Sequence, residues 1–512
     1  MIRSASLNAQ RRTAELDRLG NGGNVDVLVV GGGIVGVGVA LDAASRGLSV
    51  ALVERRDLAN GTSRWSSKLI HGGLRYLRQA EIGLAWESAR ERHILMQRTA
   101  PHLVQALPFV VPLDAAVSPI LGLLSDVGIR AGDALRRFAG SSRRELPGPR
   151  RISAHEAARL VPGLRRDDLR GAILMWDGQA VDDARLVIAV ARTAAQHGAA
   201  ILTYVSVEKL EPGRATLHDE ISGRSLEIRA AHIINATGVW AGRFDDGLSL
   251  RPSKGVHLVV GAQALGDPRA ALMVPVPRSS ARWVGATPVG DDRLLVGVTD
   301  DHYDGEIPDE ATVLDSERDF LLGVLNAALR RPLLPQDVIG GFAGFRPLIS
   351  DAAASRSTAD LSRHHVIHEN HSTGVTSVVG GKFTTYRQMA EEVVDRLTQT
   401  PCRTKEVPVI GAADAASLDR LRTALPGRLV DRYGAEASVL VALAADDRSL
   451  LEPIAPGLRA LGVELLFGLR HEGALNADDL LERRLRLGLV AADRAAAESA
   501  AAHLLHAEGR AA

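Results

Sequence analysis

The hydrophobic pattern near the N-terminus predicts a strand, a helix and a second strand. Val25 to Val30 is an apolar run that ends in three consecutive glycines, which indicates a fully buried parallel strand. Ile34 to Ser45 contains mainly small and apolar residues and predicts a closely packed helix, and Ser49 to Val53 predicts the next strand, closed by Glu54. Together they form a β-α-β unit of about 30 residues, which is typical of mononucleotide-binding folds.

The remaining pattern predicts a larger α/β region followed by a helical segment. From about residue 251 to 305, short apolar runs alternate with turn residues and predict an antiparallel sheet. Proline and glycine between 401 and 414 indicate a linker, and the Ala-, Leu- and Arg-rich chain from 415 to 512 predicts a small helical cap. Elsewhere we expect helices at 81–99, 184–197 and 383–397, and strands at 200–205, 232–236 and 375–379.

Composition and charge narrow the classes of function. The 61 basic and 61 acidic residues cancel, so no global positive field would attract nucleic acid. Cys402 is the single cysteine, which excludes an intrachain disulfide, fits a reducing compartment and predicts an inert thiol. Residues 1–24 lack the apolar run of a secretory signal, and the stretch from 27 to 41 is too short and glycine-rich to span a bilayer. We therefore expect a cytoplasmic protein or one on a membrane surface.

Three glycines after the first strand form a dinucleotide-binding fingerprint. Gly31, Gly33 and Gly36 follow the spacing G-x-G-x-x-G. The first permits the tight turn, the second lets the backbone approach a pyrophosphate, and the third lets helix and strand pack closely. The helix N-terminus offers unpaired N–H groups and a positive dipole end to phosphates. Glu54 follows Gly31 by 23 residues, where a carboxylate can accept hydrogen bonds from ribose hydroxyls. A ligand-free glycine turn is the weaker interpretation.

The fingerprint alone does not distinguish NAD from FAD. A second motif, Asn235 to Gly238, follows a strand about 200 residues later, and Gly380 and Gly381 precede a late helix. Three distant segments that meet at the carboxyl edge of one sheet suit a long, extended ligand. The sequence therefore predicts FAD as the cofactor.

One long string carries a family resemblance. Residues 61–76 read Gly-Thr-Ser-Arg-Trp-Ser-Ser-Lys-Leu-Ile-His-Gly-Gly-Leu-Arg-Tyr, and with the fingerprint they closely resemble the FAD-dependent glycerol-3-phosphate dehydrogenases, which are membrane-associated respiratory enzymes. The resemblance runs from about 25 to 400 and more faintly through 472–489. Two places depart from it: Gly297 to Asp300, where the family usually shows Gly-Thr-Thr-Asp, and the stretch from Val274 to Val289. Further matches are Val181–Leu186, Lys254–His257, Gly344–Leu348 and Gly380–Arg387.

The resemblance implies an α/β fold of the glutathione-reductase and amino-acid-oxidase type. It combines an FAD-binding Rossmann-like domain with an antiparallel-sheet substrate domain and a C-terminal helical cap. We expect an N-terminal extension at 1–24, FAD-binding segments at 25–80, 180–250 and 340–400, substrate-domain segments at 81–179 and 251–339, a linker at 401–414 and the cap at 415–512.

The resemblance also implies which residues bind the ligands. A glycerol phosphate carries about two negative charges and requires several cationic donors. We expect Arg75, Tyr76, His257, Arg346, Arg363 and Lys382 to surround the substrate, with His257, Arg346 and Lys382 catalytic. The expected FAD ligands are Gly31, Gly33, Gly36, Glu54, Thr62, Ser66, Ser67, Lys68, Leu69, His71, Gly72, Gly238, Gly381, Lys382, Phe383 and Thr384.

The implied reaction oxidises glycerol 3-phosphate to dihydroxyacetone phosphate by hydride transfer from C2 to N5 of FAD. His257 is the expected base, since imidazole titrates near neutral pH, and Arg346 would stabilise the developing alkoxide. The resemblance implies a quinone acceptor, hence peripheral contact with the inner face of the cell membrane; a homodimer is left open. Alternatives are an oxidase that uses oxygen, an amine or amino-acid oxidase, which Arg75, Arg346 and Lys382 argue against, and a flavin-bound sensor.

Two further segments have residue patterns that suit a role at the protein surface. Residues 109–140 combine apolar Phe109, Val110, Ile120, Leu121, Leu123 and Leu124 with basic Arg130, Arg136 and Arg137, which predicts either a membrane-docking surface or a buried helix. The cluster of His364, His365, His368 and His371 has metal-ligand residue types but lacks cysteine or close carboxylates, so a solvated loop without metal is expected.

Overall fold

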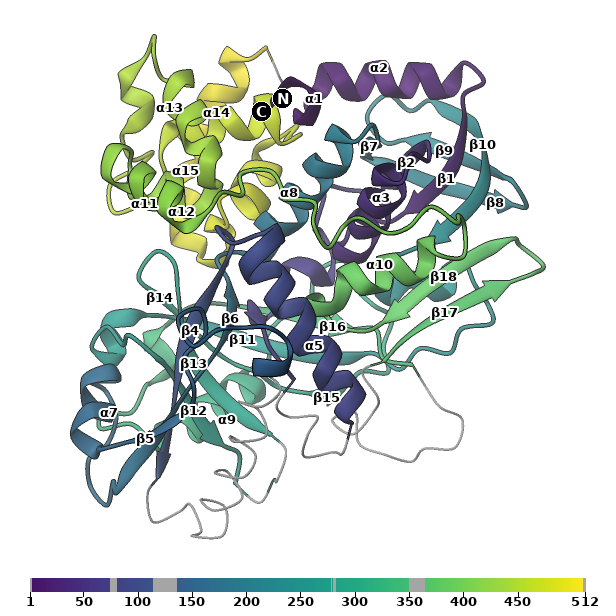
Figure 1. Ribbon diagram of the computed structural model, residues 1–512. Coiled ribbons are helices and arrows are strands. Elements are labelled where there is room, and N and C mark those ends of the chain that lie inside the picture. Colours follow the sequence, from purple (N-terminus) through teal and green to yellow (C-terminus); the bar gives the residue numbers. More distant parts are fainter. Residues whose placement is uncertain are drawn as a thin grey trace.

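The computed structural model describes residues 2–73, 81–113, 136–277, 279, 282–349 and 364–509. They form three lobes (Figure 1): one around a mainly parallel sheet, one around an antiparallel sheet, and a helical lobe formed by the C-terminal part. Arg75, Tyr76, Arg363 and residues 114–135 lie outside the described residues.

The parallel sheet is built from the apolar runs that the sequence predicts. Its central strands lie in the order β18-β10-β1-β2-β7, and each neighbouring pair is parallel. Buried faces on both sides explain why these strands read as continuous apolar runs. Their bounds are β1 Asn24–Val30, β2 Val50–Glu54, β7 Ala200–Thr203, β10 Ser225–Asn235 and β18 Val375–Gly380.

Strand β10 is longer than the predicted segment 232–236. Its first half alternates between exposed and buried side chains and pairs antiparallel with β9 (Arg214–Asp219), which in turn pairs with β8 (Val205–Glu211). Only the second half is buried on both faces, so only that half carries the apolar run from which the strand was predicted.

Helix α3 (Ile34–Ser45) lies between the parallel sheet and two other helices. It packs against α8 (Asp183–Gln196) and α10 (Tyr386–Val394), which explains why small and apolar residues occupy all its faces. A Cβ on Gly38 would lie 2.8 Å from the ring of Tyr386, so the glycine lets α10 approach closely. The predicted helices at 34–45, 81–99, 184–197 and 383–397 are all confirmed, the last with a 3-10 turn over Phe383–Thr385.

The antiparallel sheet expected at 251–305 is also confirmed, and it recruits strands from much earlier in the chain. Its order is β15-β11-β14-β13-β12-β4-β6-β3, with β16 paired to β11 and β5 to β6. Helices α7 (Ala154–Leu160) and α9 (Asp315–Asn326) pack against it. The strands are β3 Leu69–Ile70, β4 Val104–Leu113, β5 Arg150–Ile152, β6 Gly171–Ala180, β11 Ser253–Gly261, β12 Ala271–Pro275, β13 Trp283–Val289, β14 Arg293–Gly297, β15 Asp301–His302 and β16 Val338–Arg346.

The structure describes only part of the segment 109–140. Phe109 and Val110 lie buried in β4, inside this sheet, and Arg136 is also buried, which argues against membrane docking through these three side chains. The other apolar residues of that hypothesis, Ile120, Leu121, Leu123 and Leu124, lie outside the described residues, as does Arg130.

The expectation that the histidine cluster lies in a loop is wrong for His365 and His368. Both belong to strand β17 (His365–Asn370), which pairs with β18. His365 contacts Glu392 and His368 contacts Asp245; within the described ranges, no group of three or more potential ligands could hold a metal ion.

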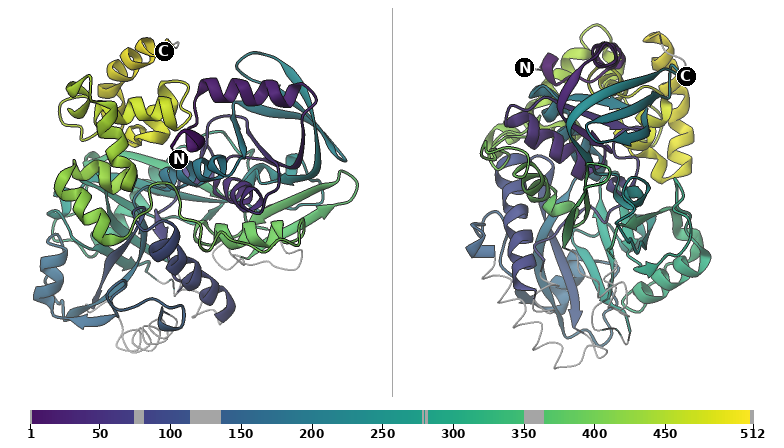
Figure 2. Two further views of the ribbon diagram at one scale, coloured as in Figure 1. Left: turned by 45° about the horizontal axis from the view of Figure 1, so that its top comes forward. Right: turned by 90° about the vertical axis from the view of Figure 1, so that its right-hand side faces the viewer.

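Both chain ends pack onto the body of the protein. Helix α2 (Ala9–Gly20) follows α1 (Ile2–Ala5) and lies along the parallel sheet, where Leu16 and Leu19 are buried (Figure 2). Residues 2–24 are therefore an integral part of this lobe. The C-terminal helices are α11 Ala415–Ala424, α12 Gly427–Tyr433, α13 Ala437–Leu443, α14 Gly462–His471 and α15 Ala491–Ala507, with short turns between them.

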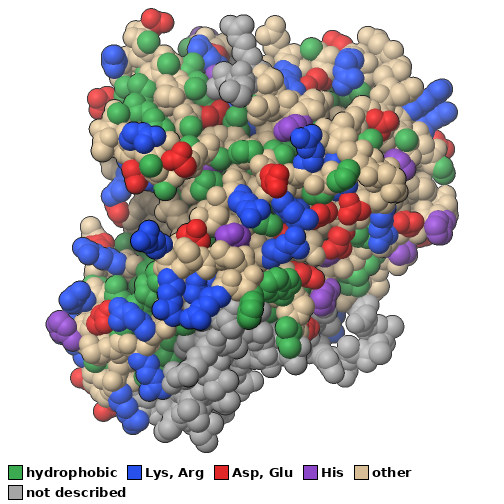
Figure 3. Space-filling model, in the orientation of Figure 1, with side chains coloured by type: hydrophobic (Ala, Val, Ile, Leu, Met, Phe, Trp, Pro, Cys, Tyr) green, Lys and Arg blue, Asp and Glu red, His purple; other side chains and the backbone are tan. Residues whose placement is uncertain are grey.

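Acidic and basic side chains are interspersed over the face shown in Figure 3. Among the described helices, none combines the length and the apolar character that crossing a membrane requires.

Candidate active site

A cavity of about 580 Å³ runs from the carboxyl edge of the parallel sheet to the β11–β16 pair of the second sheet. Ligands of open α/β sheets bind at this edge, where the loops that follow the strands diverge. The walls come from stretches far apart in the chain. They include these predicted site residues: Gly31, Gly33, Glu54, Thr62, Ser66, Ser67, Leu69, His71, Gly238, His257, Arg346, Gly381, Lys382, Phe383 and Thr384.

The glycine fingerprint forms one end of this cavity. Gly31 has φ +113°, a conformation that side chains strongly disfavour. A Cβ on Gly36 would lie 1.9 Å from the Gly31 carbonyl oxygen, so only glycine permits this close contact. Gly33 is the N-cap of α3 and has no side chain of its own to cap the helix; Ser63 Oγ instead accepts a hydrogen bond from Ile34 N at 2.9 Å. The other N–H groups of the first turn have no partner within the helix and suit a bound phosphate.

Glu54 is oriented by the backbone at the end of β2. Its Oε2 accepts a hydrogen bond from Gly32 N at 2.7 Å, and its Oε1 accepts one from Arg56 N at 2.9 Å. Burial raises the pKa of this carboxyl, although both hydrogen bonds oppose the shift. Each oxygen has a further lone pair, so the carboxylate can still accept a bond from a ribose hydroxyl.

His257 lies on β11 at the opposite end of the cavity. Its Nε2 is 2.9 Å from Ser67 Oγ, and its ring stacks on Phe342 with centroids 4.9 Å apart. Burial, with smaller effects from the charges of Arg346 and Lys68, lowers the pKa of His257 to about 3. The imidazole is therefore neutral near pH 7. A pKa this low makes it a weak base in the ligand-free chain, so the expectation that it titrates near neutral pH is wrong for this state.

Two cationic side chains line the same cavity. Arg346, at the end of β16, donates to Ser253 Oγ at 3.2 Å, to Asp300 Oδ1 at 3.3 Å and to Thr299 O at 3.4 Å. The string that departs from the family pattern, Gly297 to Asp300, thus orients this guanidinium. Lys382 donates to Ser88 Oγ at 2.6 Å and to Leu84 O at 3.5 Å, both on α5 (Ile82–Ile94).

Three residues expected to bind FAD do not line the cavity. Gly36 packs beneath the turn, as described above. Lys68 is buried, and its Nζ forms an ion pair with Asp183 at 2.6 Å. Gly72 donates its N–H to Asp177 at 2.9 Å. These three residues lie behind the residues that line the cavity and support the cavity wall.

Sequence reasoning missed several residues of the site. Ser63 was within the matched string and could have been selected from it, because a hydroxyl beside a helix start is a natural cap. Trp240 also lines the cavity. Ser88 had no signal, since it is an ordinary polar residue within a predicted helix.

The walls fit an adenine dinucleotide with a flavin. The open helix start suits a pyrophosphate, and Glu54 suits a ribose. Two buried polar atoms, Trp240 Nε1 and Thr384 Oγ1, have no hydrogen-bond partner within the part of the chain that the structure describes. Buried polar atoms normally find partners, so a polar ligand would satisfy them.

Comparisons with known proteins agree with this class of site. Residues 26–387 match the family of FAD dependent oxidoreductases, and residues 402–508 match the C-terminal domain of alpha-glycerophosphate oxidase. The fold and the match together define an FAD-dependent oxidoreductase, with FAD as its cofactor.

The similarity extends over nearly the whole chain. Glycerol-3-phosphate dehydrogenase 1 of Mycobacterium tuberculosis is 50% identical over 503 residues, covering 96% of this chain and 97% of that protein; glycerol-3-phosphate dehydrogenase 2 of the same species is 38% identical, covering 95% and 85%. The crystal structure of glycerol-3-phosphate dehydrogenase from Bacillus halodurans complexed with FAD shares the fold, with a TM-score of 0.73 at 24% identity over 98% of this chain and 92% of that one. The chain belongs to the FAD-dependent glycerol-3-phosphate dehydrogenases.

Proposed function

We propose that this enzyme oxidises sn-glycerol 3-phosphate to dihydroxyacetone phosphate. The observation that carries the proposal is the placement of Arg346, Lys382 and a neutral His257 on one cavity with the open start of α3. A phosphate dianion requires cationic donors, and a secondary alcohol that loses a hydride must also lose a proton. The names of the relatives agree with this substrate.

Two side chains bind the substrate and a third accepts its proton. Arg346 and Lys382 bind the anionic substrate and orient its C2 carbon, and such positioning contributes several kcal/mol, on the order of 7–11 in favourable cases. When bound, FAD supplies the acceptor for the hydride that leaves C2. The hydroxyl proton passes to Nε2 of His257, the ring nitrogen that faces Ser67.

Substrate binding itself makes His257 a better base. The charge of Arg346 is one cause of the lowered pKa of His257. A bound dianion offsets that positive charge and therefore raises the proton affinity of the imidazole. The base becomes stronger only when the substrate is in place.

The visible spectrum tests the proposed substrate. Anaerobic addition of glycerol 3-phosphate to the purified yellow holoenzyme should bleach the oxidised flavin, because no acceptor is present to reoxidise it. Glycerol, which lacks the phosphate, serves as the matched control and should leave the spectrum unchanged. A flavin that glycerol 3-phosphate does not reduce would refute the proposal and favour a sensor.

We also propose a membrane quinone as the electron acceptor, with the enzyme bound peripherally to the inner face of the cell membrane. Ile82 and Trp86 lie four positions apart on α5 and are exposed to 65% and 38%. Exposed apolar side chains on one helix face suit the interfacial region of a bilayer. The same helix carries Ser88, which accepts a hydrogen bond from Lys382, and this link supports the proposal of a membrane contact close to the substrate site.

Liposome flotation tests the membrane contact. The wild-type enzyme should float with anionic vesicles, and the double variant Ile82→Ser and Trp86→Ser should lose most of this binding because each residue contributes buried apolar area. Ile221→Ser is the matched control, since Ile221 is 58% exposed but lies at the β9–β10 hairpin. Equal flotation of all three proteins would rule out α5 as the contact.

An oxidase that uses oxygen is the second candidate, because residues 402–508 match a domain of alpha-glycerophosphate oxidase. Peroxide formed in one-to-one ratio with substrate in the presence of a quinone would favour oxygen. Negligible peroxide with rapid quinone reduction would favour the proposed acceptor.

A further inference from the structure

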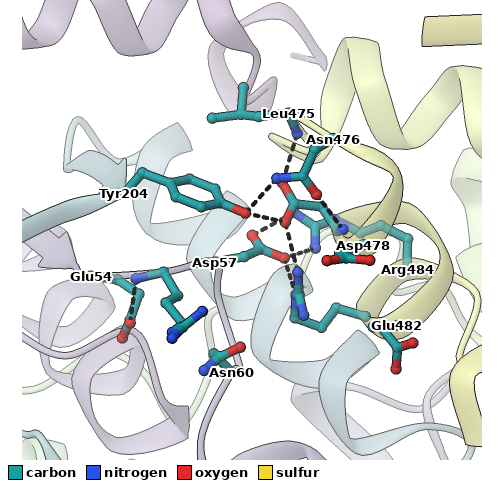
Figure 4. A network of polar contacts seen from close by, with 12 residues as sticks. Glu54, Asp57, Asn60, Tyr204, Leu475, Asn476, Asp478, Glu482 and Arg484 are labelled. Atoms are coloured by element: carbon teal, nitrogen blue, oxygen red, sulfur yellow. Dashed lines mark hydrogen bonds and ion pairs between the residues drawn. The ribbon is translucent and has the colours of Figure 1, made fainter. Parts of the chain in front are cut away.

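A buried ion-pair network joins the C-terminal lobe to the loop behind the fingerprint end of the cavity (Figure 4). Asp57 accepts hydrogen bonds from the two terminal nitrogens of Arg484, Nη1 and Nη2, at 2.6 and 2.9 Å, and from Arg483 Nε at 2.6 Å. Asp57 and Arg484 are fully buried. Asp57 directly follows Arg56 and precedes Asn60 by three positions, and both of these neighbours line the cavity.

Tyr204 provides a second link to the same loop. Its backbone N–H donates to Arg56 O at 2.8 Å, and its hydroxyl donates to Asp479 Oδ1 at 2.6 Å. Arg483 also binds Asp479, at 2.7 Å. The network therefore contains two carboxylates and two guanidinium groups that neutralise one another, and the chain around Glu54 is connected to residues 479–484 by side-chain and backbone bonds.

Arg486 connects the C-terminal lobe to a second wall of the cavity. Its guanidinium donates to Arg64 O at 2.6 Å and lies 5.1 Å from the centroid of the Trp65 ring. Trp65 and the following serines line the cavity. Arg486 also lies 3.8 Å from Asp183, the carboxylate that binds Ser66.

We propose that Arg483, Arg484 and Arg486, here termed the arginine clamp, are positioning residues for FAD. The clamp holds two cavity walls, residues 54–60 and 61–67, in the arrangement that binds the cofactor. Docking of the C-terminal lobe and binding of FAD therefore stabilise each other.

The burial of the clamp explains why its effect should be strong. Burial disfavours the charged form of Asp57, yet the charges of Arg484 and Arg483 lower its pKa, so the carboxylate remains ionised. Removing either partner leaves an uncompensated buried charge, and the loop would then move to expose Asp57 to water. Such movement displaces Arg56 and Glu54, which are one and three positions away.

A pair of conservative variants tests the proposal in the full-length holoenzyme. Arg484→Lys keeps the charge but loses the bidentate contact with Asp57. Arg192→Lys is the matched control: Arg192 is equally buried and makes a bidentate pair with Glu436 at 2.6 and 2.8 Å, which joins the same two lobes. Unlike Asp57, neither Arg192 nor Glu436 is next in the chain to a residue that lines the cavity.

The readout is the rate of FAD release after dilution, followed by flavin fluorescence. Both variants should unfold at lower temperature than wild type. Only Arg484→Lys should release FAD faster, by about tenfold, the scale of a typical coupling between two sites. Release at the same rate from both variants would overturn the proposal, because the pairs would then act on general stability alone.

A measurement on the wild-type chain gives an independent test, even where Arg484→Lys does not fold. Coupling is reciprocal, so FAD must stabilise the clamp if the clamp favours FAD binding. Amide hydrogen exchange of residues 479–486 should slow when FAD is added to the flavin-free chain, whereas α13 should exchange at an unchanged rate. Unchanged exchange at 479–486 would refute the coupling. Both readouts follow FAD alone, so they do not depend on the proposed substrate.

Discussion

Replacing Arg346 by alanine should lower kcat/KM for glycerol 3-phosphate by at least about 10³-fold while FAD stays bound. Removal of one donor that stabilises developing charge costs on the order of 10²–10³ in rate, and the loss of phosphate binding adds to this. Arg346 lines the cavity near His257 and takes part in lowering its pKa. Steady-state kinetics with a quinone analogue, together with the flavin absorbance of the purified variant, provide the measurement.

Arg293→Ala is the control for this prediction. Arg293 lies on β14 of the same sheet, which β11 separates from β16, and forms an ion pair with Asp493 at 2.8 Å; its side chain is 28% exposed against 23% for Arg346. It does not line the cavity, so its variant should keep near wild-type kinetics. If the Arg346 variant turned over at the wild-type rate, or lost its FAD, the proposed role would be wrong.

Replacing Gly36 by alanine should abolish FAD binding and strongly destabilise the lobe around the parallel sheet. The new Cβ would lie 1.9 Å from the Gly31 carbonyl oxygen and 3.1 Å from its carbon. Alanine is favoured over glycine in a helix by about 1 kcal/mol, but a contact this short with backbone forces the turn and the helix apart and costs more. The displaced turn no longer presents the helix N-terminus to the pyrophosphate.

Gly323→Ala separates this clash from the general effect of alanine in a helix. Gly323 lies within α9, and a Cβ there would meet no atom within 4 Å. This variant should keep its flavin and unfold at the same or slightly higher temperature. FAD content and thermal unfolding of the two variants are the measurements, and a Gly36 variant purified with a full complement of FAD would contradict the expected clash.

Much of the fold follows from local patterns. The buried strands β1, β2 and β18 read as continuous apolar runs, and α3 reads as a helix without a polar face because it is covered on every side. The matched string at 61–76 indicated the family and one stretch of the cavity wall, from Gly61 to His71.

Other features could not be predicted in this way. The pairing of β12 with β4 joins segments more than 150 residues apart, and the local pattern of neither strand indicates which strand it pairs with. Periodicity also assigned the histidines of β17 to a loop, because polar residues on an edge strand resemble those of a turn. Ser88 also lacks a local signal. Its hydrogen bond to Lys382 depends on the tertiary structure, which brings α5 next to a residue far away in the chain.

The amino-acid sequence by itself determined the glycine turn, the secondary structure around it and the chemical types of the site, because these depend on backbone sterics and on residues close together in the chain. Only the tertiary structure decided the partners of the buried charges. Arg484 looks like any surface arginine of a helical segment until folding brings it to Asp57, 427 positions earlier. A buried charge is stable only with an opposite charge beside it, and that neighbour is set by the fold of the whole chain.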